Sequence, residues 1–204
     1  AEAGVAIASG ANTVGVPAFS PGASYATTLN NVNQTAGLFG YRNVGFTNNG
    51  LQITYNPTFD SVTVDQLLDT AKLFKSAMEV MIATEMSEGT LENIATVFGQ
   101  ASSTLADNGL TGTANVKTLG LEAGALGAAP TERQLIAVGL APTAASTTSE
   151  RVYYARRVLS VQQSQFSLAR NTATSFPVTF RLLPDAGYTG SEYGKIIDRT
   201  WTPA

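Results

Sequence analysis

An alternation of apolar and polar side chains over residues 77 to 86 constrains the fold of this chain more than any other feature. In an extended chain, one side would carry a mostly apolar set, which is Met78, Val80, Ile82, Thr84 and Met86. The opposite side would carry Glu79, Met81, Ala83 and Glu85. Because successive side chains of a β-strand point to opposite faces, this period of two predicts a strand with one face on a core.

Strand signals continue on both sides of this run. Asn48-Asn49-Gly50 favours a hairpin turn between Phe46-Thr47 and the alternating residues 51 to 55. The alternation resumes at 58 to 64 after Pro57, and a short helical turn is expected at 65 to 68. Further strands are predicted at 133 to 140, about 150 to 163, 176 to 182 (with Phe176, Val178, Phe180 and Leu182 facing inward) and 193 to 201.

One segment has the spacing of an amphipathic helix. Its apolar residues recur at i, i+3, i+4 and i+7, and they are Leu91, Ile94, Ala95 and Phe98. Ser87 or Thr90 is suited to cap the start of the helix, and Gly99 to end it. We expect this helix to pack its apolar stripe on the outside of a sheet.

The order of these elements predicts the fold class. Seven to nine strands without intervening helices disfavour a parallel sheet and favour an antiparallel β-sandwich or half-barrel with one flanking α-helix. In a chain of 204 residues, we expect a β-domain at 45 to 204 with a long loop insertion at about 100 to 130. Residues 1 to 44 are rich in small and polar residues and are expected to carry little core. A disordered tail and an arm that orders against a neighbouring copy remain equal alternatives.

The residue types that are missing limit the chemistry. The chain contains no histidine and no cysteine, so the most common general base, a thiolate nucleophile and any cysteine-based metal site are absent. The 15 acidic residues are scattered and form neither a calcium loop nor a paired-carboxylate spacing. We therefore expect a protein that is not an enzyme and has no cofactor or metal site.

The charge and hydropathy of the chain indicate its partners. A formal net charge of −3 gives no basic patch for gripping nucleic acid. Charged residues make up only 13% of the chain, against roughly 25% in a typical soluble domain, which suits a surface covered by copies of the same protein. The apolar stretches are too short to span a bilayer. The first residues lack a secretory signal pattern, so synthesis and folding in a cytoplasm are expected.

Charged residues on two predicted strands are candidates for contacts between subunits or for a channel. Aromatic and cationic side chains occur on both faces of 150 to 163, so we expect inter-subunit contacts from Arg151, Tyr153, Arg156 and Arg157. Glu88 and Glu92 suit the start of the helix, where they favour its dipole. Glu79 and Glu85 lie on the wet face of their strand, and in an assembly this face is suited to line a channel.

Several short motifs, taken in order, resemble the tail-tube (major tail) protein family of tailed bacteriophages. The first is Gly45-Phe46-Thr47-Asn48-Asn49-Gly50-Leu51, similar to the hairpin opening of the family. The second is Val62-Thr63-Val64-Asp65-Gln66, followed by the strand 77 to 86 and then Glu88-Gly89-Thr90-Leu91-Glu92-Asn93-Ile94. Phe180-Arg181-Leu182-Leu183-Pro184-Asp185 is similar to its late strand. The resemblance covers 44 to 99 well and 150 to 200 loosely.

This resemblance implies a structural subunit of the virion tail, assembled in the cytoplasm of a host bacterium. Its copies would form stacked, hexameric rings around a lumen through which DNA passes without specific binding. The implied partners are further copies and other tail proteins, such as the tape measure and the terminator, with no membrane. The lumen-facing candidates are Gln52, Thr54, Glu79 and Glu85.

Two other classes of β-rich protein remain open on the sequence. A head–tail joining or head decoration protein of a virion would form no open-ended stacks. The tube of a phage-like contractile injection system would carry protein instead of DNA. A carbohydrate-binding β-sandwich is disfavoured because Trp201 is the only tryptophan.

Overall fold

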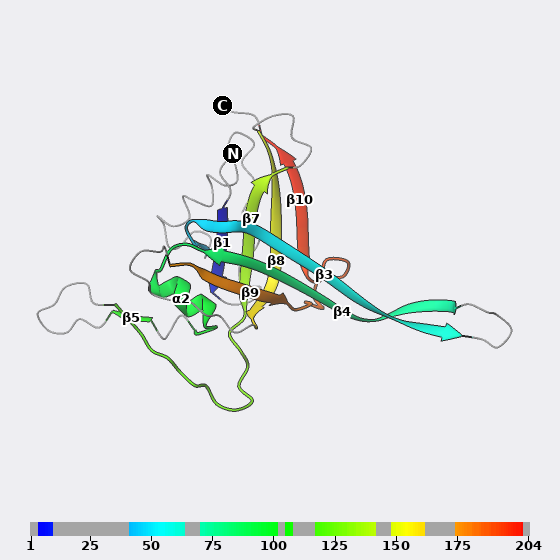
Figure 1. Cartoon of the computed structure of the whole chain (residues 1–204), viewed down its shortest axis with the longest axis horizontal. Coiled ribbons are helices and arrows are strands. Elements are labelled where there is room, and N and C mark those ends of the chain that lie inside the picture. Colours follow the sequence, from blue (N-terminus) through cyan, green and yellow to red (C-terminus); the bar gives the residue numbers. More distant parts are fainter. Residues whose placement is uncertain are drawn as a thin grey trace, which may run out of the picture.

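The computed structural model describes residues 4–9, 41–63, 70–101, 105–107, 117–141, 148–161 and 174–201 (Figure 1). These residues form a mainly β structure with one short helix. The elements are β1 (Gly4–Ser9), β2 (Tyr41–Asn43), β3 (Thr47–Thr63), β4 (Thr70–Met86), α2 (Leu91–Val97), β5 (Leu105–Asp107), β6 (Lys117–Leu119), β7 (Arg133–Leu140), β8 (Ser149–Ser160), β9 (Phe176–Leu182) and β10 (Gly194–Thr200).

Eight of the strands form one antiparallel sheet. Seven follow the order β2-β1-β7-β8-β9-β4-β3, and β10 pairs with β8 beside this path. One edge of β8 is occupied by β7. The other edge is divided, because residues 149–155 pair with β10 and residues 158–160 pair with β9. The sheet therefore forks at β8, with β10 on one branch and β9, β4 and β3 on the other.

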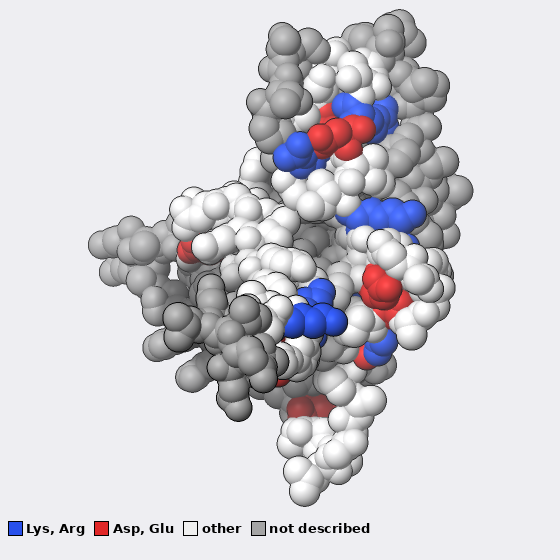
Figure 2. All heavy atoms as spheres, turned by 90° about the vertical axis from the view of Figure 1, so that its right-hand side faces the viewer, with Lys and Arg blue, Asp and Glu red and all other residues white. Residues whose placement is uncertain are grey.

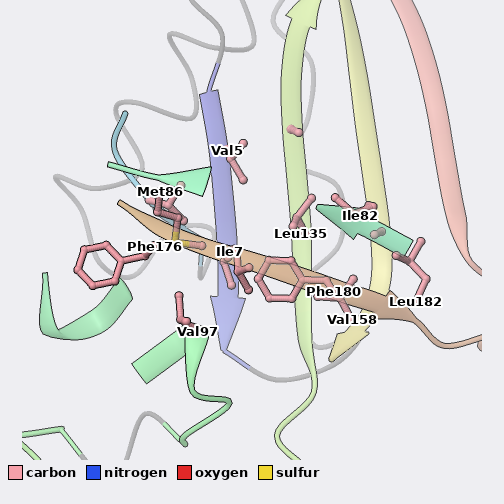
Figure 3. Packing of buried hydrophobic residues seen from close by; sticks show 14 of the residues in the cluster. Val5, Ile7, Ile82, Met86, Val97, Leu135, Val158, Phe176, Phe180 and Leu182 are labelled. Atoms are coloured by element: carbon pink, nitrogen blue, oxygen red, sulfur yellow. The ribbon is translucent and has the colours of Figure 1, made fainter. Parts of the chain in front are cut away.

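The sheet encloses its main core by curving, since side chains from distant strands meet in one cluster. Val5 and Ile7 of β1 pack with Leu135 of β7, and with Phe176 and Phe180 of β9 (Figure 3). A second cluster lies on the opposite face of β1, β7 and β8 and includes Ile136, Val152 and Tyr154. The predicted class, an antiparallel β-structure with one flanking helix, is confirmed.

The alternating patterns predicted the buried faces of two neighbouring strands correctly. In β9, the four predicted inward residues, Phe176, Val178, Phe180 and Leu182, are all buried. In β4, Val80, Ile82, Thr84 and Met86 are buried, while the residues between them are half-buried. Ile82 pairs with Phe180 and Thr84 with Val178, so the two inward faces form one continuous surface.

The expectation that residues 1 to 44 carry little core is wrong for the two parts of this segment that the structure describes. β1 pairs with β7 over its whole length and with β2 on its other edge. Val5, Ala6, Ile7 and Ala8 are buried. Small residues suit this position because β1 is covered on both faces, and such a strand lacks the alternation that marks a half-buried strand. Residues 10–40 lie outside the described part.

The predicted hairpin turn at residues 48–50 is also wrong. Asn48 pairs with Glu85 and Leu51 with Thr84, so Asn49 and Gly50 form a bulge within β3. Both have left-handed backbones, with φ of 59° and 67°, which Asn and Gly tolerate better than other residues. Asn and Gly, which are typical of hairpin turns, here form a β-bulge that needs the same left-handed backbone. The predicted helical turn at 65–68 lies outside the described residues.

The predicted helix is present and has both predicted ends. The Thr90 side chain accepts a hydrogen bond from the backbone N–H of Asn93 at 3.2 Å. At the other end Gly99 has φ of +68°, and the N–H of Gln100 bonds to the carbonyl of Ala95 at 2.8 Å, which closes a Schellman motif. The helix contacts β9 and the β5–β6 ribbon.

The buried face of α2 differs in part from the predicted stripe. Ala95 is buried and Ile94 packs against the core, whereas Leu91 is half-buried and Phe98 is 40% exposed. The remaining buried positions are Asn93, Thr96 and Val97. Within the described residues, we find no helix with the length and apolar character needed to cross a bilayer.

The segment expected to be a long loop at about 100 to 130 contains a small ribbon. β5 pairs with β6 in antiparallel fashion, separately from the main sheet. The bounds of β7 match the predicted strand at 133 to 140, and β8 and β10 match the predicted strands to within a few residues.

Candidate assembly surface

The most unusual feature of the surface is a two-stranded arm, made by residues 58–63 of β3 and 70–77 of β4. It extends well beyond the rest of the sheet (Figure 1). Every residue of these two stretches is exposed. An isolated two-stranded ribbon is marginally stable in water, because a hairpin buries little apolar surface by itself.

Both faces of the arm carry large apolar side chains. Phe59 pairs with Lys75, and Ser61 pairs with Leu73 on the same face. On the opposite face Asp60 pairs with Phe74, and Val62 pairs with Lys72. The exposed fractions of Phe59, Leu73 and Phe74 are 55%, 63% and 47%. Neither face therefore has the purely polar character that a strand ribbon in water would favour.

The backbone of the arm also has open edges. Within the described residues, β3 pairs only with β4, and β4 pairs with β9 only from Met81 to Met86. The backbone groups on the outer sides of the arm thus have no strand partner there. β10 likewise pairs only with β8. Such edges are templates for pairing with another chain.

An apolar groove of about 290 Å³ lies at the base of the arm, where the sheet forks. It runs between the inward face of β3–β4 and the strands β8 and β10. Its lining is Ile53, Tyr55, Met78, Val80, Ile82, Tyr153, Tyr154, Ala155, Leu182, Tyr193, Gly194, Lys195 and Ile196. Ile196 of β10 is 65% exposed and Tyr55 of β3 is 58% exposed, so the groove presents large apolar side chains to solvent.

The surface seen along the arm has little charge. Figure 2 shows that it is mostly uncharged, with Lys, Arg, Asp and Glu in a few separate groups. The described residues form several ion pairs, such as Arg151 with Asp198 and Arg157 with Glu132. This pattern agrees with the low charged content of the whole chain.

The four predicted lumen-facing residues lie on one face of the β3–β4 pair. Gln52 pairs with Ala83 and Thr54 with Met81, so both lie on the side that carries Glu79 and Glu85. The opposite side carries Ile53 and its partner Ile82, which face inward. The structure thus brings the four residues onto one polar face.

The two glutamates of this polar face have partners. Glu85 accepts hydrogen bonds from the side-chain amides of Asn48 and Asn49, at 3.4 and 2.7 Å, and so braces the bulge in β3. Glu79 forms an ion pair with Arg181 of β9 at 3.6 Å. On this face, both carboxylates therefore have partners within the chain, and Arg181 adds a positive charge.

The predicted inter-subunit arginines of β8 have partners within the chain. Arg151 makes two hydrogen bonds to Asp198, which lower the pKa of that carboxyl group. Arg157 makes two to Glu132, at 2.7 and 2.6 Å, and lowers its pKa in the same way. Arg156 is buried and stacks over the ring of Tyr188 at 3.5 Å. These contacts account for the charges of β8 without a neighbouring copy.

Tyr153, the fourth predicted residue of that set, has a different environment. It packs against the main core and lines the groove, next to Tyr193, which is also partly buried against the core. Of the four, it is the one that lines the groove.

Sequence patterns did not identify the arm or the groove. Residues 70–77 contain Leu73 and Phe74 side by side, with Lys72 and Lys75 around them, so they show no period of two. The groove arises from the fork at β8, which depends on pairing between strands far apart in sequence. The apolar side chains of residues 58–63 were the only available signal.

The part of the chain that the structure describes contains no group of three or more acidic residues arranged to hold a metal ion. No protein-family model matches the chain, and no curated protein sequence is similar to it.

Proposed function

We propose that this protein is a structural subunit that assembles with copies of itself into the stacked rings of a bacteriophage tail tube. The arm carries this proposal, since it exposes apolar side chains on both faces and extends away from the core. A monomer gains nothing from such an element, whereas an assembly buries it. Closure of rings also removes open strand edges, which β3 and β10 present.

The resemblance in sequence supports the tail tube among the possible assemblies. The described residues of the motifs that carry it lie mainly in β3, the base of β4, α2 and β9. In this proposal the polar face with Gln52, Thr54, Glu79 and Glu85 lines the lumen. Amides and hydroxyls do not bind phosphate strongly, carboxylates repel it, and the one cation noted on this face, Arg181, is paired with Glu79, so DNA would pass without being held.

In this proposal the protein performs no chemical step and uses no cofactor, and its place is the virion. Its partners are copies of itself, with further tail proteins at the ends of the tube. The tube acts as a passive conduit. Contacts between subunits set the diameter of the lumen, and the side chains that line the lumen determine how freely DNA moves through it.

Electron microscopy of the purified, concentrated protein tests the proposal, with light scattering to give the mass. We expect hollow tubes or stacked rings from the wild type. The double variant F59S/L73S removes two apolar side chains from one face of the arm and should stay monomeric with an unchanged thermal midpoint. Leu126→Ser, at a fully exposed leucine far along the chain, is the matched control and should assemble.

Each other outcome has a distinct meaning. Closed oligomers that do not stack would favour a joining or decoration protein. Assembly of F59S/L73S at the wild-type concentration would remove the arm as the basis of the proposal.

A further inference from the structure

Two arginines lie together beneath α2, and within the described part of the chain neither forms an ion pair with an acidic residue. Arg42 of β2 pairs with Ile7 of β1, and Leu135 of β7 pairs with the same residue from the other side. Arg133 precedes Leu135 by two positions, so it lies on the same face of the sheet as Arg42. This is the face that contributes Ile7 and Leu135 to the main core.

The guanidinium group of Arg42 contacts α2, and that of Arg133 contacts the segment just after it. Nη1 of Arg42 donates to the Asn93 side-chain oxygen at 2.7 Å, and Nη2 to Thr96 Oγ1 at 3.5 Å. Nη2 of Arg133 donates to the carbonyl of Gln100. The N–H of Gln100 bonds to the carbonyl of Ala95, the residue before Thr96, which brings Gln100 close to Thr96. The two cations are therefore close neighbours.

Their charges are poorly compensated. Among the described residues, neither arginine takes part in an ion pair. The negative charges of Glu92 and Glu88 act on Arg42, but Glu92 forms an ion pair with Lys117 at 3.4 Å and Glu88 accepts a hydrogen bond from the backbone N–H of Phe46. Burial, together with the positive charge of Arg42, lowers the pKa of Arg133 to about 10.

Arg133 also has unused donors. A guanidinium group carries five N–H donors, and Arg133 makes one hydrogen bond in the described structure, to Gln100. The residue is only 5% exposed, yet none of its nitrogens is among the side-chain atoms that are sealed without a partner. The remaining nitrogens of Arg133 are therefore not sealed from solvent.

We propose that Arg42 and Arg133 form a binding site for a small oxyanion, a phosphate or a carboxylate. Two adjacent guanidinium groups present planar donors that match the oxygens of such groups. A bound anion would offset the mutual repulsion of the two cations and the cost of burying Arg133 without a counter-charge. This site is independent of the proposed tube function. The anion comes either from solution or from a carboxylate of a second copy.

Thermal unfolding in sodium phosphate, against sodium chloride at matched ionic strength, tests the site. The wild type should gain several degrees in midpoint, saturating with phosphate, because a ligand that binds the folded state stabilises it by mass action. Arg133→Met and Arg42→Met should lose this gain. Arg181→Met, at an exposed ion pair on β9, is the control and should keep it. Equal midpoints of the wild type in the two salts would overturn the proposal.

A measurement on the wild type covers the case in which Arg133→Met fails to fold. In a ¹⁵N spectrum of arginine side chains, the Nε–H signals of two arginines should shift saturably with phosphate, and Arg42→Lys should remove one of the two. Uniform small shifts of all arginine signals would reflect ionic strength alone and would also refute the site.

The effect of phosphate on assembly distinguishes the two possible sources of the anion. If the anion is a carboxylate of a second copy, phosphate should raise the concentration needed for assembly of the wild type, and Arg133→Met should raise it further. If the anion is free phosphate, assembly should be unchanged or favoured by phosphate.

Discussion

Gly45 and Glu88 occupy adjoining space at the start of β3. A Cβ atom on Gly45 would overlap the carboxylate of Glu88, which accepts a hydrogen bond from the backbone N–H of Phe46 at 3.2 Å. Gly45 also has a left-handed backbone, with φ of +82°. This contact joins the strand that leads into the arm to the segment that precedes α2.

Gly45→Ala should therefore destabilise the fold by about 2 kcal/mol, from backbone strain plus displacement of Glu88. Gly50→Ala is the control, because Gly50 has a similar φ of +67° but open space around its Cα. It should cost only about 1 kcal/mol of strain. Urea denaturation of the two variants measures the difference. Equal losses would show that the contact with Glu88 is unimportant.

Asn93 should be the most sensitive polar residue of α2. Its side-chain amide donates to the carbonyls of Val44 and Glu88, at 2.8 and 2.9 Å, and its oxygen accepts from Arg42. Since Asn93 is completely buried, Asn93→Ala leaves these groups unsatisfied and should cost about 2 to 3 kcal/mol in unfolding free energy. Asn56→Ala, at an exposed position of β3, should cost less than about 0.5 kcal/mol. Similar losses in the two variants would contradict the role of Asn93.

Asn93 also shows what limits prediction from the sequence. The strand faces of β4 and β9 followed from alternation, because each strand has one buried and one wetter side. The helix stripe was only partly predicted, since Asn93 and Thr96 are buried through hydrogen bonds that hydrophobic spacing does not register. β1 was missed for a similar reason. Both of its faces are buried, including the face that carries the small residues Ala6 and Ala8, so its sequence shows no alternation of apolar and polar residues.

The pair of arginines depends on long-range pairing. Arg42 and Arg133 are 91 positions apart (133 − 42) and meet only because β1 pairs with both of their strands. Sequence spacing contains no sign of this. The polar face of β3–β4 was predictable because its residues come from two adjacent alternating strands.

The two leucines of β7 provide a direct test of where the core ends. Leu135 is completely buried and Leu140 is 55% exposed on the same strand. Leu135→Ala should cost roughly 2 to 5 kcal/mol, through lost burial and the cavity left behind. Leu140→Ala should change stability by less than about 0.5 kcal/mol. Thermal and urea unfolding followed by circular dichroism give both values, and a cost at Leu140 above that at Leu135 would contradict the packing of β7.

The ion pair between Glu132 and Arg157 predicts a pH dependence of stability. Hydrogen bonds from Arg157 lower the pKa of Glu132 below its ordinary value of 4.5. A carboxyl group whose pKa is lower in the folded state stabilises the fold above the unfolded pKa and loses this contribution as the pH falls through the folded pKa. Glu132→Gln should therefore cost up to about 1 kcal/mol at neutral pH, a modest value because the pair is partly exposed.

The difference in unfolding free energy between the wild type and Glu132→Gln should shrink as the pH falls below 4.5. Urea denaturation over a series of acidic buffers measures it. Glu122→Gln, at an exposed glutamate before β7, is the control and should show little difference at any pH. A difference for Glu132→Gln that stays constant across the series would mean that the charge of Glu132 contributes nothing, and that its contact with Arg157 acts only as a neutral hydrogen bond.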